Sequence, residues 1–251
     1  MNSLKKIAIS NRKGGVGKST IASQIAYGLS YLGYNTLLLS ADSQNDSGKI
    51  LGIYKEDLVK KKDLKAFLGN VAREEEVLID IRENLSMIYT ENLGKLNSFL
   101  AEEKRVEKMV QISLDKFEDV FDFMIIDTSP SDSRINDCLL IYADSIIVPV
   151  ETSYLSSSAI EEMFEYVSEL REDLSKIKLI IPNKYRKVVK KHNEHLEAIR
   201  GIFADTETKV LNPIPIRSEI EKAGEEGLSI FEIKSDLQEI FGEILKEVAE
   251  L

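Results

Sequence analysis

The segment 7–26 constrains the fold more than any other part of the chain. A short apolar run at 7–9 leads into a glycine-containing loop, and Lys18, Ser19 and Thr20 then begin a pattern with apolar residues at helical spacing. This order is typical of a strand, a tight loop and the start of a helix, which is the context of a phosphate-binding loop. The segment therefore predicts an α/β fold with an anion site beside the loop.

The loop has the residue types that phosphate binding needs. Glycines allow backbone conformations that other residues avoid, so that successive N–H groups turn inward near a helix N-terminus. Lys18 is expected to reach the β and γ phosphates, and Ser19 to place its hydroxyl on Mg²⁺. The predicted nucleotide contacts are Gly14, Gly15, Val16, Gly17, Lys18, Ser19 and Thr20. Arg12 stands where the strict pattern G-x-x-x-x-G-K-[ST] has its first glycine.

The run from Lys13 to Ser19 resembles the deviant Walker A loop of the ParA/MinD family, whose members often lack that first glycine, and in particular small Soj-like partition ATPases. The resemblance implies ATP and Mg²⁺ as cofactors. It also implies that Lys13 is the signature lysine, which reaches the partner's phosphates across a nucleotide-sandwiched homodimer. The alternatives are a chance glycine-lysine loop and, for Lys13, an ordinary solvated charge.

Strand-like and helix-like segments alternate along the chain. Strands are expected at 36–40, 85–89, 121–126, 145–150 and 177–181, and helices at 55–68, 96–117, 135–142, 158–170 and 236–251. This alternation predicts a doubly wound, mostly parallel sheet with helices on both faces, of the P-loop NTPase type. Since no linker or repeat divides the chain, residues 1–251 are expected to form a single ATPase domain. With the first strand beginning near residue 5, no N-terminal helix-turn-helix extension is expected.

Two aspartates follow apolar strands, at the edge where ligands of parallel sheets bind. Asp127 is expected to orient a water on Mg²⁺, as a Walker B carboxylate does. The segment around Asp42 and Gln44 resembles the family's switch I, with Ser40 in place of its first aspartate. The resemblance implies that Asp42 orients or deprotonates the attacking water, while Lys13 and Lys18 offset phosphoryl charge. Ordinary turn roles are the alternatives for both aspartates.

Later segments extend the resemblance. The run 127–131 is similar to the family's D-T-P-P-S switch II, with Ser129 replacing the first proline, and 143–150 is similar to its A-D-x-x-x-x-P-V segment. By analogy Asn183 would hydrogen-bond the adenine and Pro215 would pack near the base. For Asn183 a simple turn role is equally open.

The formal charge of −10 means that the average surface repels nucleic acid and anionic membranes. One dense basic run departs from this average. In the family that the chain resembles, the matching segment contains an arginine for non-specific DNA binding, and Arg186 is its nearest match. The resemblance therefore implies that this run binds DNA. The candidate DNA-binding residues are Lys184, Arg186, Lys187, Lys190 and Lys191. A solvated helix face is the alternative.

The function implied is an ATPase that dimerises on ATP, binds DNA and partitions a plasmid, chromosome or other cargo, with hydrolysis stimulated by a ParB-like adaptor. Without a signal or membrane-spanning segment, a cytoplasmic, nucleoid-associated location is expected. One alternative is a MinD-like regulator anchored to a membrane by the final helix, but the acidic polar face of that helix favours core packing instead. A second alternative function is that of a P-loop metabolic ligase. The lone Cys138 is expected to be a core residue.

Overall fold

A computed structural model describes residues 3–154 and 156–251, which form an eight-stranded sheet in the order β3-β4-β2-β5-β1-β6-β7-β8. Neighbouring strands are parallel except for the antiparallel pair β3–β4. The strands are β1 (Lys5–Ile9), β2 (Thr36–Ser40), β3 (Ile79–Arg82), β4 (Leu85–Ile88), β5 (Phe123–Asp127), β6 (Ser145–Glu151), β7 (Ile177–Asn183) and β8 (Lys209–Val210). The predicted mostly parallel α/β fold is confirmed, whereas β3 and β8 were not predicted.

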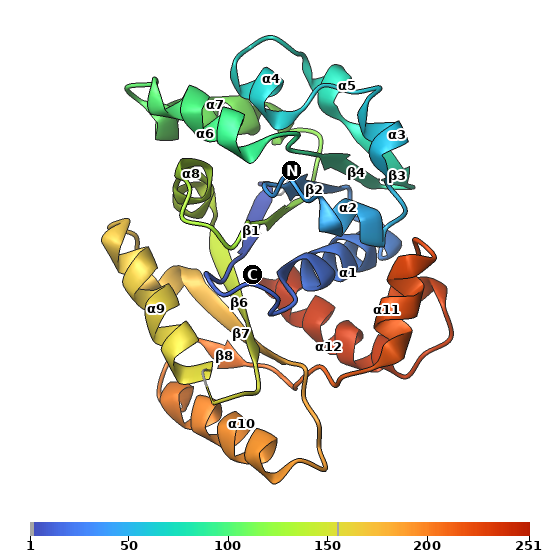
Figure 1. Cartoon of the computed structure of the whole chain (residues 1–251), viewed down its shortest axis with the longest axis vertical. Helices are drawn as coiled ribbons and strands as arrows, with labels where there is room; N and C mark the ends of the chain where they lie inside the picture. The colour runs from blue at the N-terminus through green and yellow to red at the C-terminus, as the bar shows by residue number, and fades with distance from the viewer. Residues whose placement is uncertain (1–2, 155) are drawn as a thin grey trace.

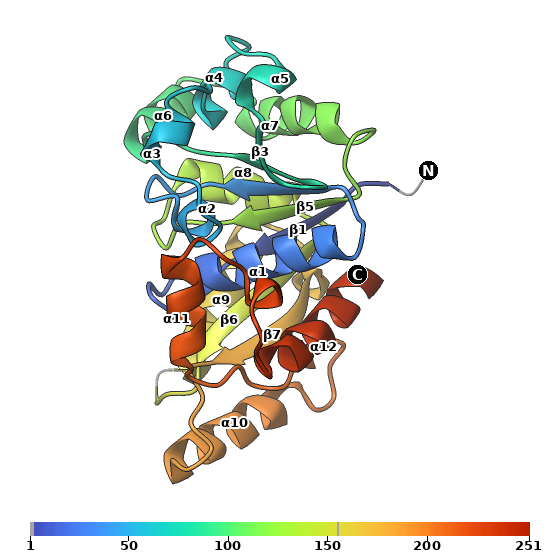
Figure 2. The same cartoon turned by 90° about the vertical axis from the view of Figure 1, so that its right-hand side faces the viewer.

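Helices cover both faces of this sheet (Figures 1 and 2). One group comprises α1 (Lys18–Tyr31), α2 (Asp46–Ile50), α3 (Lys55–Leu58), α11 (Ser218–Glu225) and α12 (Leu237–Glu250). The other comprises α4 (Leu64–Leu68), α5 (Glu74–Val77), α6 (Leu93–Ala101), α7 (Val106–Leu114), α8 (Arg134–Tyr142), α9 (Ser156–Glu169) and α10 (Lys190–Phe203). The two faces enclose separate clusters of buried apolar side chains, as the doubly wound arrangement requires.

The central strands show why their sequences are apolar without interruption. In β2, Leu37 and Leu39 belong to one buried cluster and Leu38 belongs to the other. In β5, Met124 and Ile126 alternate with Phe123 and Ile125 in the same way. Because successive side chains of a strand point to opposite faces, a strand covered on both sides needs apolar residues at every position.

The predicted helix 55–68 is wrong, since α3 and α4 are separate short helices. Asp63 starts α4 as its N-cap, and its side chain accepts a hydrogen bond of 3.1 Å from the Ala66 N–H. An N-cap residue has an extended backbone, and Asp63 has φ −94° and ψ 174°. The capping aspartate therefore ends any continuous helix through this region.

The predicted helix 96–117 is also wrong, because the chain turns between α6 and α7. The buried residues of α6 include Leu96 and Leu100, and those of α7 include Val106 and Val110. At 3.6 residues per turn, six residues from Leu100 to Val106 rotate by about 240° beyond a full turn, so one straight helix would aim the two apolar stripes in different directions. Arg105 leaves the helical region, with φ −131° and ψ 54°, and both stripes reach one cluster.

The last helix packs within the molecule. Its residues Leu237, Phe241, Ile244, Leu245 and Val248 are buried in the cluster that includes α1, and the Cδ1 atom of Leu245 would lie 2.4 Å from a Cβ placed on Gly28. Among the described residues, no helix is long and apolar enough to cross a membrane. Cys138 is buried in α8, and burial raises the pKa of its thiol to about 12, as expected for a core residue.

Replacement of Ile244 by alanine tests the packing of α12. Ile244 is 1% exposed, so Ile244→Ala is expected to lower the free energy of unfolding by about 3 kcal/mol through lost burial and a residual cavity. Urea denaturation measures this loss. The exposed Lys246→Ala in the same helix is the control and should change stability by less than about 0.5 kcal/mol. Equal effects of the two substitutions would contradict a buried apolar face.

Candidate nucleotide-binding site

The register of β5 brings the candidate residues together. Asp127 lies opposite Ile9 of β1 on one side and opposite Ser40 of β2 on the other. The loops that leave these three strands therefore meet at one edge of the sheet, which lies away from both chain termini (Figure 2). A cavity of about 1140 Å³ opens there, and its lining includes Lys18, Ser19, Asp42, Thr128, Asn183 and Pro215.

The glycine loop adopts the conformation that its sequence predicts. Gly15 and Gly17 have positive φ angles of 74° and 101°, a region that favours glycine. Gly17 is the N-cap of α1 and no side chain caps that helix, so its first N–H groups are available to an anion.

Asn11 fixes the loop to the sheet, a role that no sequence motif indicates. Its buried side chain donates to the Pro149 carbonyl oxygen at 2.8 Å and accepts from the Lys13 N–H at 2.8 Å. The shape of the loop thus depends on β6.

Arg12 explains how the loop tolerates a side chain in place of the first glycine. Its guanidinium pairs with the Asp132 carboxylate at 2.5 Å and lies 5.3 Å from the ring centroid of Tyr166 in α9. Neither Arg12 nor Asp132 lines the large cavity. The side chain therefore links the loop to the segment after β5 and leaves the glycine backbone clear.

Lys18 is buried at the base of the cavity, where its ammonium donates to the Lys13 carbonyl oxygen at 3.1 Å. Burial lowers the pKa of Lys18, and the nearby carboxylates of Asp127 and Asp42 oppose that shift. A cation in a partly desolvated position of this kind interacts strongly with an arriving anion.

Asp127 is fully buried, and neither of its carboxylate oxygens has a hydrogen-bond partner among the described residues. Burial raises the pKa of Asp127 to about 7, while the hydroxyls of Ser47 and Ser19 and the charge of Lys18 act against the rise. The Ser47 hydroxyl also lacks a partner in the described part of the chain. Free oxygen atoms beside Ser19 are the donors that Mg²⁺ and its waters prefer, so these residues fit that cation. Ser47 was not predicted.

Asp42 and Gln44 line the cavity, and Asp42 also forms the turn that was its alternative role. The Asp42 carboxylate accepts from the Gln44 N–H at 3.0 Å. The turn is compatible with a role in the site, because a carboxylate has further lone pairs for a water.

Asn183 ends β7 directly against the glycine loop. Its amide nitrogen donates to the Val16 carbonyl oxygen at 2.8 Å, and its amide oxygen accepts from the Lys184 N–H at 2.8 Å. A Cβ on Gly17 would lie 2.2 Å from this amide nitrogen. Pro215 lines the same cavity.

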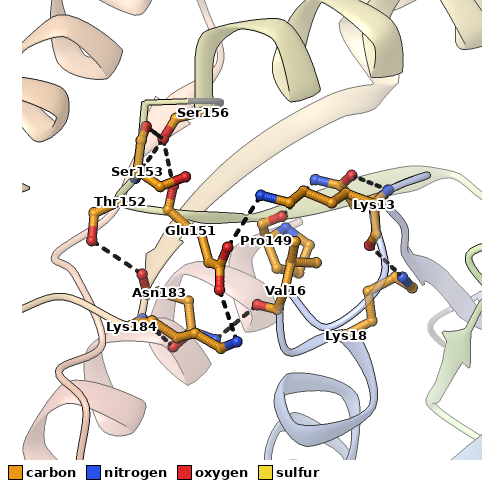
Figure 3. Close-up of polar contacts among 11 residues, drawn as sticks. Lys13, Val16, Lys18, Pro149, Glu151, Thr152, Ser153, Ser156, Asn183 and Lys184 are labelled. Carbon is orange, nitrogen blue, oxygen red and sulfur yellow. Dashed lines mark hydrogen bonds and ion pairs between the residues drawn. The ribbon is translucent and has the colours of Figure 1, made fainter.

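Lys13 lies in an ion pair within its own chain (Figure 3). Its ammonium is 3.1 Å from Oε2 of Glu151, and the ammonium of Lys184 is 2.8 Å from Oε1 of the same carboxylate. The hydrogen bond from Lys184 and, to a smaller extent, the hydrogen bond from Lys13 lower the pKa of Glu151. Sequence reasoning missed Glu151.

The structure divides the basic run into two parts. All five residues are exposed, but Lys184 also lines the cavity and pairs with Glu151. The others lie outside the cavity lining, on the loop before α10 and on its first turn: Arg186, Lys187, Lys190 and Lys191. Lys190 lies 3.6 Å from Glu194. His192 accepts from the Arg186 N–H at 3.2 Å and so helps to fix this loop.

The fold and this site define a P-loop ATPase. The model of the AAA domain family (AAA_31) matches residues 4–181. An uncharacterized protein of Methanocaldococcus jannaschii is 30% identical over 239 residues, which cover 92% of each chain. The chromosome partitioning protein ParA of Myxococcus xanthus is 26% identical over 91% of this chain and 82% of its own length. The sporulation initiation inhibitor protein Soj of Bacillus subtilis is 25% identical over 98% of both chains. This chain belongs to the ParA/Soj family of P-loop ATPases.

Solved structures agree with this fold. An ATP complex of a variant of McdA from Cyanothece has a TM-score of 0.86 at 20% identity and covers 99% of this chain and 98% of its own. Cobyrinic acid a,c-diamide synthase from Mycobacterium smegmatis, with a bound ATP analog and magnesium, has a TM-score of 0.74 at 24% identity and covers 89% and 92%.

The raised pKa of Asp127 predicts a pH-dependent stability in the absence of metal and nucleotide. With a usual pKa of 3.8 and a folded value of about 7, the folded chain holds an extra proton between these values, so stability falls as pH rises through that window. Asp127→Asn removes this penalty. Relative to the unsubstituted chain, its free energy of unfolding should rise by roughly 2–3 kcal/mol from about pH 5 to about pH 7. Urea titrations in EDTA measure the difference, and parallel pH profiles would contradict it.

Proposed function

We propose that this chain is an ATP-driven switch that forms a sandwich dimer on ATP, binds DNA without sequence preference and positions a cargo. One observation carries the proposal. A single glycine loop holds both Lys13 and Lys18, and Lys18 lines the cavity together with Asp42, near the buried Asp127. We propose that residues 1–251 act as one ATPase unit.

In the proposed bound state, N–H groups from residues 14–20 surround the phosphates, and Lys18 exchanges the Lys13 carbonyl oxygen for a phosphate oxygen. Ser19 would bind Mg²⁺ directly and Asp127 would hold it through a water. When bound, Mg²⁺ would offset the negative charge on the β and γ phosphates. Asn183 and Pro215, which line the same cavity, would contact the base.

In the proposed hydrolysis step, Asp42, Lys18 and Lys13 have separate roles. Asp42 would orient the attacking water and accept its proton, because its carboxylate sits at the rim of the cavity with lone pairs beyond the bond from Gln44. Lys18 would stabilise charge on the transferred phosphoryl group in its own subunit, and Lys13 of each subunit would do so in the other. This arrangement would make turnover depend on dimerisation.

DNA binding would come from the part of the basic run that lies outside the cavity lining. Arg186, Lys187, Lys190 and Lys191 project from one loop and the first turn of α10, against a chain charge of −10. Contacts of lysine and arginine with phosphates give salt-sensitive affinity without sequence specificity, and a dimer doubles their number. A ParB-like or other cargo adaptor would stimulate hydrolysis and release the nucleoid-bound dimer. The partition function named for the Myxococcus xanthus relative supports this proposal.

Two lysine substitutions test the switch. Lys18→Ala should abolish measurable binding of ATP and ADP, because the loop loses its buried cation. Lys13→Ala should leave monomer nucleotide affinity within about twofold and prevent the ATP dimer, since its charge would act on the partner's nucleotide. Fluorescent nucleotide titration and sedimentation velocity separate the two effects. An ATP dimer formed by Lys13→Ala would refute its assignment.

Two charge-matched double variants test the DNA surface. Arg186→Ala with Lys187→Ala should reduce the slope of log affinity against log salt by about two per subunit for arbitrary-sequence duplex DNA in ATP. Lys60→Ala with Lys62→Ala removes the same charge at a distant basic cluster, and it should leave the slope unchanged. Binding is measured at several salt concentrations with ATP and with ADP. Equal loss in both variants would mean that net charge alone matters.

A further inference from the structure

We propose that Glu151 is a positioning residue that holds the Lys13 ammonium within its own subunit and so opposes the ATP dimer, and that Lys184 weakens this hold. The inference rests on the proposed function, because it concerns the lysine that the dimer would use. Nothing in the local sequence pattern marks Glu151 for such a role; the contact joins residues 138 positions apart.

The carboxylate of Glu151 is shared between two lysines that come from different loops. Lys13 follows β1 and takes Oε2, while Lys184 follows β7 and takes Oε1. Figure 3 shows the Lys13 side chain extended toward Glu151, with Lys18 lying below the loop backbone. The side chains of Lys13 and Glu151 are only 32% and 26% exposed, so this pair is more shielded than an ordinary surface ion pair.

Glu151 is held at a fixed place. It is the last residue of β6 and pairs in register with Asn183 of β7. Its carbonyl oxygen accepts from the hydroxyl of Ser156 at 2.5 Å and from the Ser153 N–H at 2.9 Å. A carboxylate on a rigid strand end fixes the position of the ammonium that pairs with it, which places Lys13 beside its own subunit's sheet.

The backbone of Lys184 is also held in place. Its φ of 55° lies in the left-handed region, which is uncommon for lysine, and its N–H donates to the Asn183 side chain. The same Asn183 side chain bonds to the Val16 carbonyl oxygen of the glycine loop. Asn183 thus connects the backbone of Lys184 to the nucleotide site.

These contacts set up a competition for one ammonium group. For Lys13 to reach a partner's phosphates, its pair with Glu151 has to lengthen or break, and the approaching phosphates also meet the negative charge of Glu151. Lys184 offsets part of that charge and satisfies one carboxylate oxygen after Lys13 leaves. Glu151 therefore disfavours the dimer, and Lys184 favours it.

The test compares dimer dissociation constants in ATP by sedimentation velocity, in an Asp42→Ala background that slows hydrolysis. In a symmetric dimer the pair is broken twice, so an effect of about threefold per subunit becomes about tenfold overall. Glu151→Gln should tighten the dimer by about tenfold, and Lys184→Ala should weaken it by a similar factor. Opposite signs are the diagnostic result, because a merely structural role would make both variants weaker.

Glu247→Gln is the matched control. Glu247 is 28% exposed and pairs with Lys209 of the edge strand β8, away from the cavity lining. It should leave the dimer dissociation constant unchanged. Thermal melting and ADP binding by each variant check that the monomer is folded.

A second readout does not need a dimer. Reductive methylation with mass spectrometry measures the reactivity of the Lys13 ammonium in the ADP-bound monomer, and Glu151→Gln should increase its rate severalfold. If the Asp42→Ala chain forms no dimer in ATP, the proposed function fails while this measurement still tests the contact. A Glu151→Gln variant with unchanged Lys13 reactivity, or with a weaker dimer, would overturn the inference.

Discussion

The pairing of β5 between β1 and β2 is the constraint on which the rest of the structure depends. It places Asp127 opposite both Ile9 and Ser40, and therefore places three loops around one buried carboxylate. A buried carboxylate without hydrogen-bond partners lowers stability, as the rise of its pKa to about 7 reflects. The chain tolerates this cost because the ammonium of Lys18 lies nearby. Burial disfavours the charged form of Lys18 as well, and the negative charge of Asp127 favours it. Each group makes the burial of the other less costly, and the cavity lies beside them.

The central fold could be predicted from the sequence because its signals are local. Strands buried on both faces are continuous apolar runs, and a glycine loop between such a strand and a helix has one common structural meaning. The helices predicted at 55–68 and 96–117 fail for local reasons too: Asp63 caps a new helix, and the helical phase changes between Leu100 and Val106. The strand β8 has two residues, too few to show a period.

The candidate site was predictable where a motif carried it and not where contacts join distant segments. The glycine loop, Asp42 and Asp127 belong to motifs. Asn11 and Glu151 each act across 138 positions of sequence, so no window of residues contains their partners. The basic run shows the same limit: spacing alone groups Lys184 with Arg186, whereas in the structure only Lys184 lines the cavity and both are exposed.

Cys138 has a practical consequence for following the conformations of this chain. The thiol is 1% exposed within α8, and its pKa of about 12 leaves almost no thiolate at neutral pH. Because Cys138 is the one cysteine in the sequence, a second cysteine introduced on an exposed loop would be the main target of a maleimide dye. Fluorescent or spin labels can therefore be attached at chosen surface positions without first removing a native thiol.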